Sequence, residues 1–339
     1  MQEKNDKKTI GLIYGGKSPE HKISILSAKN IYAGLLDAGF EVICFYIDMN
    51  GKWYIGAPEE NDKRPLFDNN LIENLKVCES VFIAVHGKTG EDGVIGGFLE
   101  TFGIKYIGCS VESSALCFDK HRTKLALQAR GIPVARYVHI DVRDGFSFIE
   151  EFLNTKLAKS FFPCFVKPCR SGSSYGVKRV QNFQAIMPAI KEAAEYDHSV
   201  LIEEEIIARE IECAVLEGER ISEPKVSLPA EIRILDSGNS FYTTAAKYEN
   251  DSVPLQAPAN LTDDQLRIIQ NTAATAFAAL ECQSLARVDM FLTDENMVLV
   301  NEINTIPGFT PISQFPKMWD VSGLDLPNLL KALVDTAHL

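Results

Sequence analysis

The sequence lacks any apolar run long enough to cross a membrane. None of its segments approaches the roughly 20 consecutive apolar residues that a transmembrane helix requires. The opening residues, 1–8, are polar and charged and contain no apolar segment of the kind that signal peptides carry. We therefore expect a soluble protein of the cytoplasm.

Basic residues are also too few for a chain that binds polyanions. The 34 Lys and Arg residues are outnumbered by 46 Asp and Glu residues, which gives a formal net charge of −12. This average field would repel nucleic acid and anionic membrane surfaces, so we expect neither as a partner. A local basic pocket for a phosphate remains compatible with it.

Several sequence signatures of well-known chemistries are missing. The eight cysteines include no CxxC and lie in apolar segments such as those of Cys44 and Cys213, so we expect buried, reduced thiols. No GxxxxGK[ST] occurs, which excludes P-loop nucleotide binding. No Ser/His/Asp or Cys/His signature of nucleophilic catalysis is evident.

What the sequence does contain is an ordinary globular composition, with 46% hydrophobic and 24% charged residues. Its 339 residues suit two or three domains. Residues 9–14, 41–47 and 81–85 predict short apolar strands separated by helices, which is typical of a parallel sheet covered on both faces. We expect an open α/β domain over residues 1–115, with ligands beyond the carboxyl ends of its strands.

The rest of the chain predicts two further domains. Residues 116–203 contain paired strands within 164–180 around a glycine-serine turn, which indicates a small α+β domain. In residues 204–339, the strands predicted at 286–292 and 297–302 are so close that they must form an antiparallel hairpin. The expected fold class is therefore α/β and α+β, in three domains.

The last hairpin places polar side chains on common strand faces. Arg287 and Asp289 are two residues apart and share one face, as do Glu302 and Asn304 on the next strand. The hard oxygen atoms of Asp289, Glu302 and Asn304 suit Mg²⁺, which keeps water and substrate phosphate in its remaining coordination positions. The alternative is a buried salt bridge between Arg287 and Glu302 without a metal.

A candidate phosphate site begins at Lys167, which ends a predicted strand. The following loop of small residues, up to Gly176, would let backbone amides approach phosphate oxygens closely. An ordinary hairpin turn is the alternative. Lys120 opens a predicted helix and could reach the same phosphate, although a solvated surface lysine is the usual alternative.

His86 follows a predicted buried strand. A structural imidazole bonded to backbone is its alternative to a functional role. Glu91 and Asp92 lie shortly after it, and capping of the next helix is their simplest interpretation.

Taken together, these segments resemble the D-alanine–D-alanine ligase family, including its relatives from glycopeptide-resistant bacteria, through nearly all of the chain. The matching motifs are 14–20 with Ser24, 86–93, Asp119-Lys120, Lys167-Pro168 with 172–174, Glu210, Lys247-Tyr248, 286–289, and 302–310 with Ser313. The resemblance implies an ATP-grasp fold of three domains, with ATP between the central and C-terminal domains.

The resemblance also implies the ligands of the nucleotide. The nucleotide-binding residues would be Lys120, Lys167, Ser173, Ser174, Glu203, Glu204, Ile206, Glu210, Lys247, Asn301 and Glu302. The two lysines would hold phosphates, the segment 203–206 would meet the adenine edge, and Glu210 would accept from the ribose. The ligands of two Mg²⁺ or Mn²⁺ ions would be Asp289, Glu302 and Asn304.

Two D-alanine molecules are the implied substrates. Glu20 would bind the ammonium group of the first D-alanine, and His86 would help to bind its carboxylate. Ser313 would bind the carboxylate of the second, while Arg287 and the backbone amide of Gly308 would face the oxyanion. The catalytic residues implied are Glu20, Ser173, Tyr248, Arg287 and Gly308.

The family's reaction passes through an acyl phosphate intermediate, which water would hydrolyse. The resemblance therefore also implies a lid that closes over the site. Residues 241–258 occupy the position of the family's mobile loop, and Tyr248 would hydrogen-bond towards Glu20 and Ser173. A surface aromatic side chain in a loop is the alternative. The segment 243–246 departs from many members of the family, so contacts of this loop can differ here.

The implied activity is ATP-dependent synthesis of D-alanyl-D-alanine for peptidoglycan precursors, through an acyl phosphate. A D-alanine–D-serine ligase is the nearest alternative, because residues 285–291 also resemble resistance-type ligases. A non-catalytic nucleotide-binding regulator is an alternative of another class. The family further suggests a homodimer formed through the N-terminal domain.

Overall fold

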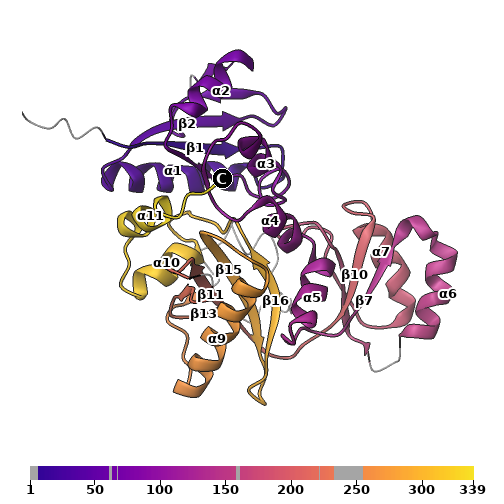
Figure 1. Cartoon of the computed structure of the whole chain (residues 1–339). Coiled ribbons are helices and arrows are strands. Elements are labelled where there is room, and N and C mark those ends of the chain that lie inside the picture. The colour runs from indigo at the N-terminus through magenta and orange to yellow at the C-terminus, as the bar shows by residue number, and fades with distance from the viewer. Residues whose placement is uncertain (1–6, 61–62, 67, 158–160, 221, 233–254) are drawn as a thin grey trace, which may run out of the picture.

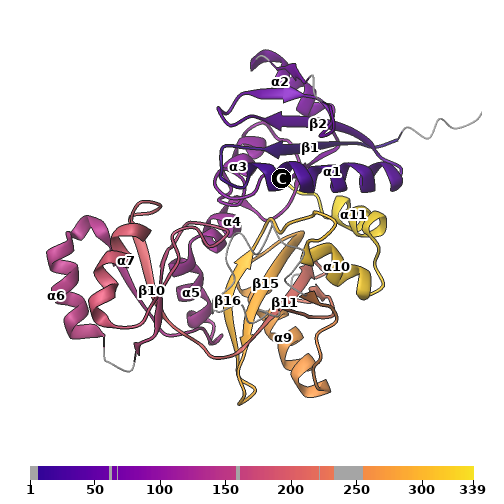
Figure 2. The same ribbon diagram turned by 180° about the vertical axis from the view of Figure 1, so that it is seen from behind.

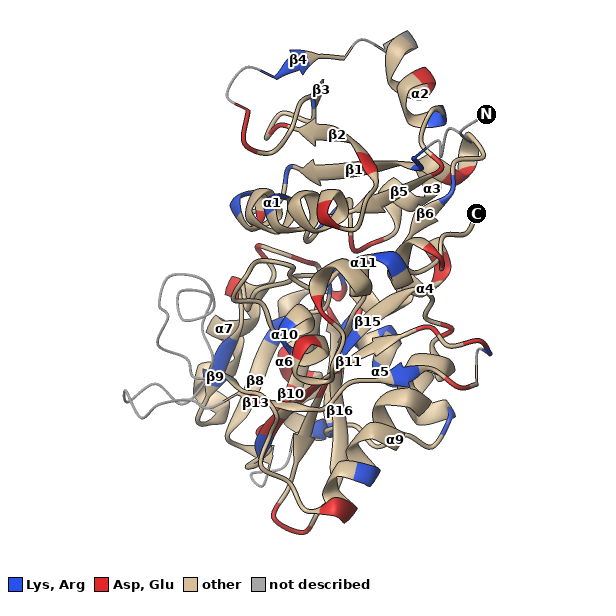
Figure 3. Ribbon diagram, turned by 90° about the vertical axis from the view of Figure 1, so that its left-hand side faces the viewer, with Lys and Arg blue, Asp and Glu red and all other residues tan. Residues whose placement is uncertain are grey.

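The computed structural model describes residues 7–60, 63–66, 68–157, 161–220, 222–232 and 255–339. Three β-sheets organise the described chain. In Figure 1 the N-terminal sheet lies at the top, the second sheet at the right and the third sheet below the first. Figure 3 shows acidic and basic residues intermingled over helices and loops of all three parts.

The N-terminal sheet has the strand order β4-β3-β2-β1-β5-β6. Its parallel strands are β1 (Thr9–Gly15), β2 (Glu41–Ile47), β5 (Ser80–Ile83) and β6 (Tyr106–Ile107). Its helices are α1 (His21–Asp37), α2 (Asp68–Lys76) and α3 (Val94–Thr101). The predicted α/β sheet is thus confirmed.

The edge of this sheet differs from the prediction of a parallel sheet. The strands β3 (Trp53–Ile55) and β4 (Arg64–Pro65) extend it in antiparallel fashion beyond β2. Strands of three and two residues are too short to give a periodic sequence pattern, which is why they were not predicted.

Two helices, α4 (Val111–Phe118) and α5 (Lys120–Ala129), lead to the second sheet, and both views place α5 between the second and third sheets (Figures 1 and 2). The antiparallel strands of the second sheet are β7 (Tyr137–Asp141), β10 (Ser199–Glu204), β8 (Cys164–Pro168) and β9 (Lys178–Val180), in that spatial order. Its helical elements are η1 (Val142–Asp144), α6 (Phe146–Lys156), η3 (Phe183–Ala185) and α7 (Ile186–Ala193).

The third sheet is antiparallel and contains the predicted hairpin. Its strands are β11 (Arg209–Leu216), β12 (Lys225–Val226), β13 (Ala230–Ile232), β14 (Leu255–Gln256), β15 (Leu285–Leu292) and β16 (Val298–Asn304). The helices of this part are α9 (Asp263–Ala279), α10 (Gln314–Val321) and α11 (Leu326–Val334). The pairing of β15 with β16 confirms the expected hairpin.

A shared apolar core joins the N-terminal sheet to the C-terminal part of the chain. It includes Leu12 of β1, Ala214 of β11 and Phe315 of α10, all fully buried. Helices α1 and α11 cross at Gly34, where an added Cβ would lie 2.6 Å from Leu330 Cδ1. A glycine is needed at this crossing because the two helices approach too closely for a side chain.

Two expectations from composition can be compared with the structure. All eight cysteines are buried and free, which confirms the prediction of buried thiols. Among the described residues, no helix combines the length and the apolar character that crossing a membrane would require.

Candidate active site

Two adjoining clefts lie where the three parts of the chain meet. The first cleft, with a volume of about 90 Å³, is lined by the segments that follow β1, β5 and β16. The second cleft, of about 190 Å³, lies between the second and third sheets. Residues from the start of α5 and from the glycine-serine loop line both clefts, so the two clefts adjoin at these residues.

Nearly all of the predicted site residues line these clefts. Those in the first cleft are Glu20, His86, Lys120, Ser173, Arg287, Glu302, Asn304, Gly308 and Ser313. Those in the second cleft are Lys120, Lys167, Ser173, Ser174, Glu203, Glu204, Ile206, Glu210, Asp289, Asn301 and Glu302. The predicted Lys247 and Tyr248 lie outside the described residues.

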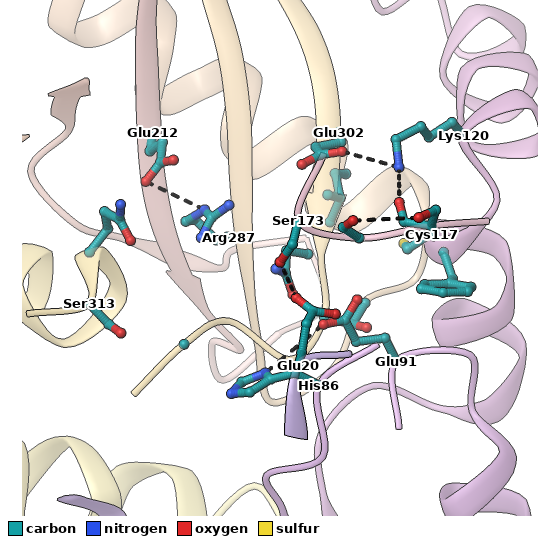
Figure 4. A pocket seen from close by; sticks show the side chains of 18 residues that line it. Glu20, His86, Glu91, Cys117, Lys120, Ser173, Glu212, Arg287, Glu302 and Ser313 are labelled. Atoms are coloured by element: carbon teal, nitrogen blue, oxygen red, sulfur yellow. Dashed lines mark hydrogen bonds and ion pairs between the residues drawn. The ribbon is translucent and has the colours of Figure 1, made fainter. Parts of the chain in front are cut away.

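The glycine-serine loop brings the second part of the chain against the N-terminal part. Ser173 and Ser174 have left-handed backbones, with φ of 49° and 60°, which non-glycine residues rarely adopt. Ser173 Oγ donates a hydrogen bond to Glu20 Oε1, and Figure 4 shows the two side chains pointing towards each other. A side chain at Gly172 would meet Glu20 Oε2 at 3.0 Å. The loop therefore lies directly over Glu20.

Both nitrogens of the His86 ring are engaged. Nδ1 lies 3.0 Å from the Ile306 carbonyl oxygen, and Nε2 lies 2.9 Å from Ser27 Oγ. Because a carbonyl can only accept, Nδ1 carries the proton and Nε2 accepts from Ser27, which itself accepts from the Phe309 amide at 3.1 Å. Burial lowers the pKa of His86. His86 therefore has the structural role of an imidazole bonded to backbone, and its contact with a substrate carboxylate stays a prediction.

Glu91 faces the first cleft, and the pKa of its carboxyl group is far above the ordinary value. Burial raises its pKa to about 8, and the nearby Glu20 carboxylate adds to that rise. Its Oε1 lies 4.0 Å from His86 Nδ1. Asp92, by contrast, accepts hydrogen bonds from two backbone amides around the start of α3. The capping interpretation therefore fits Asp92 and not Glu91.

Lys120 is fixed at the junction of the two clefts. Asp119 caps α5 by accepting from two backbone amides, so Lys120 becomes the first residue of this helix. Its Nζ donates to the Ser171 carbonyl at 2.8 Å and lies 3.5 Å from Glu302 Oε2. The ammonium group therefore sits between the glycine-serine loop and β16.

One buried carboxylate lies between two lysines at the back of the second cleft. Glu203 Oε1 is 2.5 Å from Lys167 Nζ, and Glu203 Oε2 is 2.5 Å from Lys124 Nζ. Burial by itself would raise the pKa of Glu203, but the two ammonium groups outweigh it and hold this pKa below its ordinary value. Glu203 is therefore ionised, and its side chain is directed to the lysines.

Arg287 is held by one carboxylate of its own strand, β15, and by one of the neighbouring strand β11. Its Nε and Nη2 donate to the two oxygens of Asp289 at 2.6 and 2.7 Å, and Nε lies 3.4 Å from Glu212 Oε2. Burial would lower the pKa of Arg287, but Asp289 and Glu212 raise it well above the ordinary value. The strand register places Glu212, Asp289 and Glu302 opposite one another on β11, β15 and β16. The guanidinium thus lies beside a row of three carboxylates.

Two models of known protein families match the segments that form the clefts. A family model described as D-ala D-ala ligase N-terminus matches residues 9–109, and one described as D-ala D-ala ligase C-terminus matches residues 126–335. The chain belongs to the D-alanine–D-alanine ligase family. The predicted resemblance is thereby confirmed.

Members of this family match the chain over almost its full length. The D-alanine–D-alanine ligase of Oceanobacillus iheyensis is 38% identical, over 98% of this chain and 95% of the relative. The solved D-alanine-D-alanine ligase of Coxiella burnetii has a TM-score of 0.81 and 36% identity, over 97% of this chain and 93% of its own. The VanG D-Ala:D-Ser ligase of Enterococcus faecalis has a TM-score of 0.84 and 32% identity, over 97% and 99%. These structures confirm the ATP-grasp fold class.

Two charged residues of this family member's site were not predicted from its sequence. Glu212 lines both clefts, and Lys124 pairs with Glu203 behind the second. Glu212 is two residues after the predicted Glu210 on β11, and Lys124 is four residues after Lys120 on α5. The strand and helix periods would have placed each beside its predicted neighbour.

Proposed function

We propose that this chain joins two D-alanine molecules into D-alanyl-D-alanine and converts ATP to ADP and phosphate. The observation that carries the proposal is the match, over 98% of the chain, to relatives named D-alanine–D-alanine ligase. The arrangement of the described side chains in the two clefts supports it. The biological product would be the dipeptide unit of peptidoglycan precursors.

The second cleft would hold ATP, as the family implies. Lys120 and Lys167 would bind phosphate oxygens, together with backbone amides at Ser173 and Ser174. The adenine edge would meet the backbone around Glu204 to Ile206, and Glu210 would accept from the ribose. The cleft's position between the second and third sheets supports this assignment.

Asp289, Glu302 and Asn304 would hold two Mg²⁺ ions against the ATP phosphates. Their donor set fits the ion, because carboxylate and amide oxygens are the hard ligands that Mg²⁺ prefers. The register of β15 and β16, which places Asp289 opposite Glu302, supports a shared site. When bound, the ions would neutralise phosphate charge and align the reacting groups.

The first cleft would hold the two amino acids. Glu20 would bind the ammonium group of the first D-alanine, and its hydrogen bond from Ser173 fixes the carboxylate for this purpose. Ser313 would bind the carboxylate of the second D-alanine. Its hydroxyl lies 2.8 Å from that of Thr310, and an added Cβ at Gly308 would lie 2.8 Å from Ser313 Oγ. A side chain at Gly308 would therefore displace Ser313.

The reaction would proceed in two steps. A carboxylate oxygen of the first D-alanine attacks the γ-phosphorus of ATP, so that an acyl phosphate forms and ADP leaves. The uncharged amine of the second D-alanine then attacks the acyl carbon, loses a proton, and phosphate departs. Arg287 and the Gly308 amide would stabilise the oxyanion in the second step, since preorganised donors act strongly in a site that excludes water.

The proposal also covers the architecture of the enzyme. The three parts would be domains with boundaries at 1–115, 116–203 and 204–339, and residues 241–258 would form the lid with Lys247 and Tyr248. A homodimer through the N-terminal domain and a cytoplasmic location are further parts of the proposal. Light scattering during size-exclusion chromatography, and fractionation of cells, would measure these two properties.

A product assay tests the activity. The purified chain is incubated with ATP, Mg²⁺ and D-alanine alone, then with D-serine or D-lactate added, while ADP release is followed and products are identified by mass. We expect D-alanyl-D-alanine from D-alanine alone. A mixed product with D-serine in preference would establish the alternative specificity of the VanG type, and no ADP release with any D-amino acid would contradict both.

A further inference from the structure

Lys124 is a buried cation that the proposed reaction does not use. It lies on α5, one turn after Lys120, and its side chain is 1% exposed. Unlike Lys120, it lines neither the first nor the second cleft as the described residues form them. Burying an ammonium group is costly unless an anion compensates it, so its partner indicates its role.

That partner is the carboxylate that also holds Lys167. Glu203 is 3% exposed and lies between the two ammonium groups at equal distances of 2.5 Å. Lys167 lines the second cleft, whereas Lys124 approaches Glu203 from the α5 side. The two lysines are therefore not equivalent, because only Lys167 can reach a ligand in the cleft.

The charge balance among Lys124, Glu203 and Lys167 would change when an anion enters the second cleft. If Lys167 turns to a phosphate oxygen, Glu203 loses one of its two cations while it remains buried. With Lys124 present, one cation still compensates the carboxylate, and the cost of releasing Lys167 stays small. Without Lys124, Glu203 would have Lys167 as its one remaining lysine partner, and the phosphate would have to compete with it.

We propose that Lys124 is a positioning residue for nucleotide binding, which neutralises Glu203 so that Lys167 is available to the phosphates of ATP. This inference rests on the proposed nucleotide site. It predicts that Lys124 acts only through Glu203, and that its effect appears in nucleotide affinity. Binding of D-alanine in the first cleft should be unaffected.

The test is a double-mutant cycle on the full chain, with binding of ADP and Mg²⁺ measured by calorimetry in the absence of D-alanine. We expect Lys124→Met to weaken ADP binding on the order of tenfold, because Lys167 becomes the sole lysine partner of a buried carboxylate. Lys124→Arg should restore part of the affinity. In steady-state assays the KM for ATP should rise, with the KM for D-alanine and kcat little changed.

The double variant separates positioning from a purely structural role. In Lys124→Met/Glu203→Gln the carboxylate no longer needs compensation, so ADP affinity should equal that of Glu203→Gln alone. A further loss in the double variant, or unchanged affinity in a folded Lys124→Met, would overturn the proposal. If Lys124→Met does not fold, the comparison of the double variant with Glu203→Gln still decides.

A matched control and an independent readout complete the design. Lys8 forms an exposed pair with Glu79 in the N-terminal sheet, so Lys8→Met should bind ADP as the unaltered chain does. Because ADP binding is measured without amino acids, the result does not depend on which dipeptide is made. Failure of the ligase proposal would instead appear as the absence of a dipeptide from the unaltered chain.

Discussion

Two buried charge clusters lie on opposite sides of the second cleft, and their charges are inverse. In the lysine cluster, Glu203 lies between Lys124 and Lys167. In the arginine cluster, Arg287 contacts Asp289 and Glu212. Two ammonium groups and one carboxylate give a formal charge of +1, whereas one guanidinium and two carboxylates give −1.

The difference in formal charge fits the proposal that this cleft receives both an anion and a cation. The lysine cluster can give one cation to a phosphate and remain internally neutral. The arginine cluster, which the register of β16 extends with Glu302, carries a net negative formal charge that would favour the proposed metal ion. An arginine keeps its charge at every relevant pH, and its planar donors match a carboxylate in two-point contact, which a lysine does not provide.

Removing the guanidinium of Arg287 should reduce turnover more than any other change in the two clusters. Arg287→Met would leave Asp289 and Glu212 buried beside Glu302 without their cation, and it would remove the proposed oxyanion donor. We expect kcat for ADP release with D-alanine to fall on the order of 10²- to 10³-fold. Arg143→Met, which alters an exposed pair with Asp141, is the control. An unchanged kcat in a folded Arg287→Met variant would remove Arg287 from the chemistry.

Glu302 tests whether the negative cluster receives a metal. Glu302→Gln keeps the shape of the side chain but removes one charged ligand, so we expect Mn²⁺ binding in the presence of ADP to weaken on the order of tenfold to a hundredfold. Electron paramagnetic resonance of free Mn²⁺ measures this directly, alongside turnover. Glu79→Gln in the N-terminal sheet is a suitable control. Unaltered Mn²⁺ binding and turnover would contradict the metal assignment.

The sequence could predict the members of the two clusters that sit in recognisable surroundings. Lys167 precedes a glycine-serine loop, and Arg287 and Asp289 alternate within an apolar strand, so local pattern was enough for them. The pairing of β15 with β16 followed from the short turn between them. These features depend on neighbours in the sequence.

The other contacts of the clusters join distant segments, including that of the predicted Glu203 with the unpredicted Lys124. Lys124 and Glu203 are 79 positions apart, and Glu212 reaches Arg287 through the pairing of β11 with β15. The edge strands β3 and β4 were missed because they are too short for a periodic pattern. Such partners are set by sheet order, which the local pattern does not contain.

Glu91 is a buried acid outside both clusters, and none of the described cations is held against it at short distance. Its pKa is raised from 4.5 to about 8 by burial and by Glu20 and Glu302, against weaker opposing effects of a hydrogen bond from the Gly87 backbone and of Lys120. The folded chain therefore keeps a proton that the unfolded chain loses, so this contribution to stability is present below about pH 4.5 and lost as the pH rises towards 8.

Urea unfolding at a series of pH values measures this effect. The unfolding free energy of the unaltered chain should fall relative to that of Glu91→Gln by about 3.5 kcal/mol between pH 5 and pH 8. The two proteins share their other titrating groups, so the difference isolates Glu91. Curves that stay parallel over this range would show that Glu91 ionises as it does in water.

Removing the charge of Glu212, the more distant carboxylate of the arginine cluster, should lower turnover the least. Glu212 approaches Arg287 at 3.4 Å, while Asp289 forms the two short hydrogen bonds. Glu212→Gln should therefore lower kcat only about fivefold to tenfold, a barrier change near 1 kcal/mol, whereas Asp289→Asn should cost more. Steady-state kinetics of ADP release would compare the two variants. A loss in Glu212→Gln as large as that in Asp289→Asn would mean that Arg287 is held equally from both sides, as Glu203 is held by its two lysines, and the contrast between the clusters would then lie in charge alone.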